Sequence, residues 1–180
     1  MEDLNKVNEV LSQLKSVRIV MLPPCTVASY HFIGENPEEK VGDIVDKFVR
    51  ESKLYEIKPD ARMFGFNHPN PSSNNQNYGY EDWVTITEDM EVPEPLIKKH
   101  FSGGMYAAHT IAFPDFHEWE LLRNWVNASE KYAANYSPDG AEIMSGCLEE
   151  HLNWVYCAHH GWPENGIDGR LDLLLPIKMK

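Results

Sequence analysis

Cysteine, long apolar runs and cationic residues are all scarce in this chain of 180 residues. Its three cysteines are widely spaced and odd in number, which indicates reduced thiols and a cytoplasmic location. No apolar stretch approaches the roughly 20 residues of a membrane span, and the N-terminus is too polar for a secretory signal. With 16 Lys and Arg against 28 Asp and Glu, the net charge of -12 argues against nucleic acid as a partner.

The sequence motifs of common metal and cofactor sites are missing as well. There is no Gly-x-Gly-x-x-Gly or phosphate-binding loop, and no His-Glu-x-x-His helix. His159 and His160 follow Cys157, but no second ligand pair stands at the spacing of a zinc site. Cys25 and Cys147 have no base beside them in the sequence. We therefore expect neither a metal, nor a cofactor, nor a nucleophilic thiol.

What the chain does contain is a hydrophobic fraction of 42%, enough for a packed core. Its first half reads strand, helix, strand, strand. Residues 17–33 are rich in β-branched and aromatic types and predict a strand that Pro23-Pro24 bends or bulges. The capping pattern Asn36-Pro37-Glu38-Glu39 begins a helix that an apolar stripe extends to about residue 53. A strand, a loop and a further strand follow at 61–67, 68–77 and 78–87.

The same order then repeats. The expected elements are an extended segment at 96–112 with a break at Gly103-Gly104, a helix after the capping pattern at 115–118, and strands at 142–152 and 171–178. This predicts an α+β fold in which two pseudo-repeated strand-helix-strand-strand modules form an antiparallel sheet with a central groove. We expect a single domain over 1–180, with an N-terminal helix in 1–16 and modules at 17–90 and 96–178. A loop at 153–169 carries three aromatic residues and is a candidate lid, with Trp154, Tyr156 and Trp162.

Two adjacent acids stand in the middle of the predicted strand at 142–152. Because strand side chains alternate between faces, Glu149 would share one face with Cys147 and His151, and Glu150 would take the other. One of the two glutamates therefore lies on the inner side of the sheet. A carboxylate there is costly unless it is paired or meets a ligand, so it is suited to attract a cation, hold a proton or act as a base.

Aromatic residues are the candidate walls of the groove. Tyr80 and Trp83 lie on one predicted strand and point to opposite faces, so at most one faces the groove, and Trp83 is the preferred stacking wall. Tyr106 follows the Gly103-Gly104 break and is a candidate lining residue. Trp119 and Trp125 lie on the second helix, where aromatic side chains belong either to the core or to the groove.

Four stretches of the chain carry a resemblance to a known family. They are Val27–Gly34 running into Pro37-Glu38, Tyr78–Ile86, Gly104–Thr110, and Cys147–Leu152 together with Leu171–Lys178. In order and spacing they resemble the GyrI-like effector-binding domains of multidrug-sensing transcription regulators, a SOUL-like fold that also occurs in stand-alone proteins. The likeness spans roughly residues 17–178.

The resemblance implies a central groove that is lined by aromatic residues and has a glutamate in its floor, within a Phe-Glu-x-Tyr-like motif. That glutamate matches Glu149, and His151 stands where the family has tyrosine. Many relatives carry a DNA-binding head, which this chain is expected to lack because few residues precede its first strand. Some stand-alone relatives hydrolyse alkylating toxins that bear a cyclopropane ring.

Two hypotheses follow for the function. In the first, a detoxifying hydrolase binds a bulky aromatic molecule in the groove, and Glu149 activates water as a general base. In the second, a non-catalytic sensing module holds a cationic aromatic ligand through a charged Glu149 and cation–π contacts, or the protein binds and modulates DNA gyrase. The identity of the ligand and the oligomeric state, a homodimer included, stay open at this stage.

Overall fold

The structure is a computed structural model that describes residues 14, 16–72, 77–137, 144–162 and 169–180. The N-terminal helix expected in residues 1–16 lies almost wholly outside these residues. Within the described part, none of the helices combines the length and the apolar character that crossing a membrane requires.

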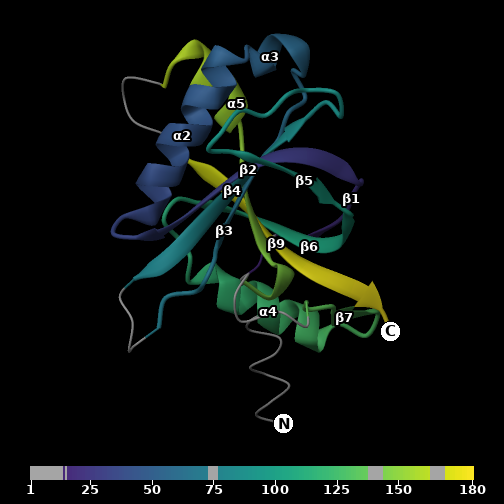
Figure 1. Cartoon of the computed structure of the whole chain (residues 1–180). Coiled ribbons are helices and arrows are strands. Elements are labelled where there is room, and N and C mark those ends of the chain that lie inside the picture. The colour runs from purple at the N-terminus through teal and green to yellow at the C-terminus, as the bar shows by residue number, and fades with distance from the viewer. Residues whose placement is uncertain (1–13, 15, 73–76, 138–143, 163–168) are drawn as a thin grey trace.

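A single antiparallel sheet forms the centre of the molecule, with strand order β1-β6-β9-β8-β3-β4-β2-β5 and β7 paired to β9 (Figure 1). This confirms the α+β class and the antiparallel sheet. The strands are β1 Arg18–Leu22, β2 Cys25–Gly34, β3 Met63–Asn67, β4 Tyr78–Ile86, β5 Ile97–Phe101, β6 Gly104–Ala112, β7 Tyr132–Ala134, β8 Leu148–His151 and β9 Arg170–Met179.

The strand order is symmetric about the pair β3 and β8. On one side of this pair lie β4 and β2 from the first half of the chain, and on the other lie β9 and β6 from the second half. The outermost strands are exchanged, because β1 leads into β2 but pairs with β6, and β5 leads into β6 but pairs with β2. The two halves therefore meet along β3 and β8, where Gly65 pairs with Glu149.

One bent strand over residues 17–33 was expected, and this prediction is wrong. Pro23-Pro24 separates two strands that have different neighbours, since β1 pairs with β6 whereas β2 pairs with β4 and β5. Proline has no N–H to give to a ladder, so two in succession end the pairing. The break expected at Gly103-Gly104 is present between β5 and β6.

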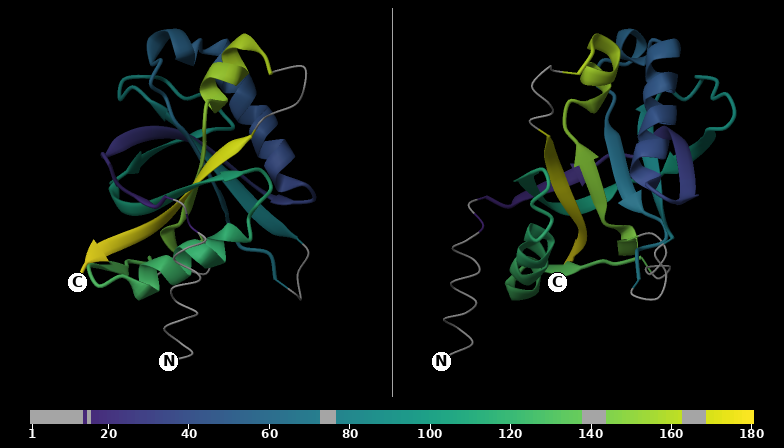
Figure 2. Two further views of the ribbon diagram at one scale, coloured as in Figure 1. Left: turned by 180° about the vertical axis from the view of Figure 1, so that it is seen from behind. Right: turned by 90° about the vertical axis from the view of Figure 1, so that its left-hand side faces the viewer.

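Two long helices cover separate halves of one face of the sheet. Helix α2 (Pro37–Glu51) buries Val41, Val45, Phe48 and Val49 against the first half. Helix α4 (Glu118–Ala128) buries Leu122 and Val126 against the second. In Figure 2 the two helices lie toward opposite ends of the molecule, with the strands passing between them. A third apolar cluster, which includes Phe64, Phe66 and Leu148, packs on the other face of the sheet.

The segment after β8 differs from the loop expected at 153–169. Residues Trp154–His160 form helix α5, which packs beside α2 and the short helix α3 (Leu54–Ile57). Val155 and Ala158 are buried in the first-half core, and this packing holds the short helix in place. Strand β8 is also shorter than the strand expected at 142–152, because a 3₁₀ turn at Met144–Gly146 precedes it.

Candidate functional site

A cavity of about 1010 Å³ opens on the helix-covered face between the two helices. Its floor includes Glu149 and His151 of β8 and Tyr80 and Asp82 of β4. Aromatic side chains from both halves of the chain form its walls, and they include Tyr78, Phe113, Phe116, Trp119, Trp154 and Trp162. Large aromatic walls around a polar floor are typical of a small-molecule site.

Glu149 lies at the base of this cavity with only 7% of its surface exposed. The Tyr80 hydroxyl donates to its Oε2 at 2.9 Å, and the Trp119 indole N–H donates to its Oε1 at 3.4 Å. Burial raises the pKa of Glu149 above its ordinary value, and the two hydrogen bonds oppose that shift only in part. The carboxyl is therefore easier to protonate than an exposed glutamate.

His151 is the third polar group beside the Tyr80 hydroxyl. Its Nε2 lies 3.3 Å from that hydroxyl, and its ring meets Trp154 edge to face at 5.1 Å between centroids. Burial lowers the pKa of His151 to about 4, so the imidazole is neutral at neutral pH. Glu149, Tyr80 and His151 thus form a contiguous acid, phenol and imidazole cluster.

The charge of the described cavity lining is predominantly acidic. Four carboxyl groups (Glu38, Glu39, Asp82 and Glu149) face one guanidinium, that of Arg170. Burial, and then the charge of Glu149, raise the pKa of Asp82 well above its ordinary value, so the ionised form of Asp82 is disfavoured there. At the rim, the Tyr78 hydroxyl donates to Glu38 Oε1 at 2.5 Å. The lining favours a ligand that carries positive charge over one that carries negative charge.

Comparison with known proteins places this arrangement in a family. The model of the family described as "Cass2: Integron-associated effector binding protein" matches residues 18–177. The chain belongs to this effector-binding family. No curated protein sequence matches it.

Several solved structures share the fold. The C-terminal domain of EcmrR superposes with a TM-score of 0.63 at 12% identity, covering 91% of this chain and 97% of that domain. EcmrR in a complex with DNA gives a TM-score of 0.62 at 11% identity, covering 97% of this chain and 64% of the EcmrR chain. A hydrolase from Listeria innocua gives a TM-score of 0.56 at 9% identity, covering 95% of this chain and 98% of that protein. At such identities the likeness is one of fold.

The residues expected to line the groove of this effector-binding domain divide between two faces of the sheet. Glu149, Tyr80, His151 and Trp119 line the cavity described above. Trp83 and Tyr106 instead line a separate hollow of about 290 Å³ with Phe66, Phe101 and Leu148. Trp125 of α4 lines neither the cavity nor the hollow, and packs against the core of the second half.

The preference for Trp83 over Tyr80 as the groove wall is therefore corrected by the structure. The two side chains do point to opposite faces, as alternation requires, but Trp83 packs edge to face on Phe66 at 4.8 Å between centroids, away from Glu149. Asp82 was overlooked, although the same alternation places it on the Tyr80 face. Trp154 and Trp162 line the cavity, the former from α5 and not from a loop.

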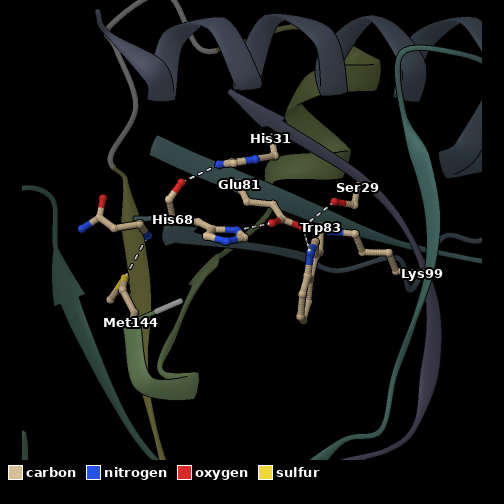
Figure 3. A network of polar contacts seen from close by, with 8 residues as sticks. Ser29, His31, His68, Glu81, Trp83, Lys99 and Met144 are labelled. Carbon is tan, nitrogen blue, oxygen red and sulfur yellow. Dashed lines mark hydrogen bonds and ion pairs between the residues drawn. The ribbon is translucent and has the colours of Figure 1, made fainter. Parts of the chain in front are cut away.

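On the opposite face from the cavity, a polar cluster forms around Glu81 (Figure 3). Potential metal-ligand atoms of His31, His68 and Glu81 lie within 4.8 Å of one another, the one such group found among the described residues. However, His68 Nδ1 lies 2.8 Å from Glu81 Oε2, and His31 Nε2 lies 2.5 Å from the carbonyl oxygen of His68. Both His68 Nδ1 and His31 Nε2 are thus already within hydrogen-bond distance of oxygen atoms of the protein.

The other carboxylate oxygen of Glu81 is engaged too. The Ser29 hydroxyl and the Trp83 indole N–H each donate to Oε1 at 2.6 Å, and the Lys99 ammonium pairs with the same oxygen. Glu81 is 1% exposed. A buried carboxylate with four donors is already compensated, so we interpret this cluster as a structural network joining β2, β4 and β5.

Proposed function

We propose that this protein binds a bulky aromatic cation in the Glu149 cavity. The observation that carries the proposal is a buried glutamate at the floor of a cavity whose walls are aromatic and whose charged lining is mainly acidic. A hydrophobic cation is stabilised there in two ways. Its rings lie against indole and phenol faces, and its charge stabilises the ionised form of Glu149. Membership of an effector-binding family agrees with that role.

The first prediction compares two ions of the same shape and opposite charge. Tetraphenylphosphonium should bind at least about tenfold more tightly than tetraphenylborate, and Glu149→Gln should weaken binding of the phosphonium by about tenfold, since one close charge pair contributes roughly 1–2 kcal/mol. Because the pKa of Glu149 is raised, the affinity should fall at a higher pH than for an ordinary glutamate as the pH is lowered. Quenching of tryptophan fluorescence and titration calorimetry measure these affinities.

A neighbouring acid offers a matched control. Glu150 follows Glu149 but faces the other side of the sheet, where the Arg62 guanidinium donates to both of its carboxylate oxygens at 2.6 Å. Glu150→Gln should lower stability and leave the phosphonium affinity unchanged. Equal affinity for the two tetraphenyl ions, or equal losses in the two glutamine variants, contradicts a cation site at Glu149.

A second candidate function is hydrolysis of an alkylating toxin that bears a cyclopropane ring joined to a conjugated carbonyl. The observation that favours it is the acid, phenol and imidazole cluster of Glu149, Tyr80 and His151 on the cavity floor. Glu149 with a raised pKa is suited to take a proton from water, whose oxygen attacks a ring methylene. The breaking C–C bond delivers its electron pair to the carbonyl oxygen, which then takes the proton, so the net change is addition of one water.

The second prediction tests this reaction directly. The wild-type protein should convert a spirocyclopropyl dienone into a ring-opened product heavier by one water, as read by mass spectrometry. Glu149→Gln should reduce the rate by at least about 100-fold, the contribution of a general base. Binding of the dienone without any water-added product supports a binding module and excludes the hydrolase.

A further inference from the structure

The floor of the cavity contains a second acid, Asp82, which lies in the same row across the sheet as Glu149. Asp82 of β4 pairs with Gly65 of β3, and Gly65 pairs with Glu149 of β8. Residues directly opposite each other in neighbouring strands share a face of the sheet. Asp82 and Glu149 therefore lie in one row on the cavity face, separated by a residue that has no side chain.

The Tyr80 hydroxyl occupies the space that Gly65 leaves open. A Cβ at position 65 would stand 2.2 Å from the Tyr80 hydroxyl oxygen and 2.9 Å from Asp82 Oδ1. The phenol thus lies between the two acids, and it donates its single proton to Glu149 Oε2. Having given that proton to Glu149, it has none left for Asp82.

The Oδ1 atom of Asp82 is consequently left without a hydrogen-bond donor among the described residues. Its side chain lines the cavity and is 2% exposed, and within the described part of the chain its Oδ1 has no hydrogen-bond partner. Buried carboxyl oxygens are normally satisfied, and an exception indicates a group that a water, an ion or a ligand completes. Arg170, the cationic member of the described lining, is itself exposed to solvent.

We propose that Asp82 selects ligands whose cationic group carries N–H, such as a protonated primary or secondary amine or an amidine, over fully substituted cations of the same bulk. This inference rests on the proposed function, because it assigns the chemical class of the ligand for that cavity. A quaternary ammonium or phosphonium supplies charge but no donor. An ammonium or amidinium supplies both. Its N–H donates a hydrogen bond to Asp82 Oδ1, and its aromatic part lies against the walls. The charge-assisted hydrogen bond from the ligand opposes the burial that disfavours the ionised form of Asp82.

The test uses two cations that share their rings and their charge, one with three N–H donors and the other with three N-methyl groups in their place. Biphenyl-4-ylmethylamine and its N,N,N-trimethyl derivative carry the same rings and the same charge at pH 7. The wild-type protein should bind the primary amine about tenfold or more tightly than the trimethyl compound, as expected for a charge-assisted hydrogen bond. Asp82→Ala, which removes the acceptor, should abolish this preference. Asp82→Asn, which keeps an uncharged acceptor, should retain part of it.

Tetraphenylphosphonium separates failure of this inference from failure of the proposed function. It has no N–H, so Asp82→Ala should weaken its binding far less than binding of the primary amine, and a cooperative unfolding transition shows that the variant is folded. If the phosphonium binds but wild type does not distinguish the two biphenyl cations, or Asp82→Ala distinguishes them as wild type does, the role of Asp82 is wrong and the cation site stands. If no cation binds to the wild-type protein, both proposals are wrong.

Discussion

Gly65→Ala should destabilise the protein by about 2–3 kcal/mol, the upper part of the range for overpacking a well-filled core. The added Cβ would stand 2.2 Å from the Tyr80 hydroxyl oxygen and 2.8 Å from its Cζ, so the phenol has to move. Tyr80 is 5% exposed and packed in the first-half core, which leaves the ring little room. Any movement that relieves the clash also breaks its hydrogen bond to Glu149. Chemical denaturation measures the loss of stability.

Another glycine beside the same cavity provides the matched control. A Cβ at Gly42 in α2 would lie 3.6 Å from the Trp154 ring, an ordinary contact. Gly42→Ala should therefore be neutral or stabilising by about 0.5–1 kcal/mol, as expected for glycine inside a helix. In the double variant Gly65→Ala with Tyr80→Phe the shortest contact is absent. The double variant should therefore lose less stability than the two single variants lose together. Strict additivity contradicts the clash.

The alternation of side chains in strands predicted much of the site. It separated Glu149 from Glu150 and Tyr80 from Trp83, and both pairs lie on opposite faces. It did not identify the face that bears the cavity, because both faces of the sheet are covered by apolar residues. On one face α2 and α4 leave a gap, and on the other Phe64 and Phe66 fill the centre. Coverage by distant helices is a tertiary property that a strand pattern does not contain.

Helix α5 is another feature that the sequence did not predict. Asn153, a residue type common at helix starts, precedes it, but its backbone is left-handed at φ 63° and its side chain makes no capping bond. Seven residues are too few to form a stable helix alone. The helix depends on Val155 and Ala158, which are buried beside α2, and this packing brings Trp154 to the cavity.

Glu81→Gln should cost about 3 kcal/mol of stability at pH 7 and almost nothing near pH 2. Burial alone would raise the pKa of Glu81, but hydrogen bonds from Lys99, Ser29, Trp83 and His68 outweigh it and lower the pKa from 4.5 to about 2. A carboxyl whose pKa is lower in the folded state contributes stability above its unfolded pKa. That contribution is lost as the pH falls from about 4.5 to about 2. A shift of this size corresponds to roughly 3 kcal/mol.

The difference between wild type and variant isolates this carboxyl from the others. Glu149 and Asp82 have raised pKa values, so their contributions change in the opposite sense and oppose the loss at low pH, but both are present in the two proteins and cancel. Urea denaturation at pH 7, 5 and 3 should show the gap between the two free energies of unfolding closing as the pH falls. The exposed Glu88, changed to Gln, should show no such gap at any pH. A gap for Glu81→Gln that is the same at pH 7 and pH 3 would mean that shape and packing, not the ionised carboxylate with its four donors, hold β2, β4 and β5 together on this face.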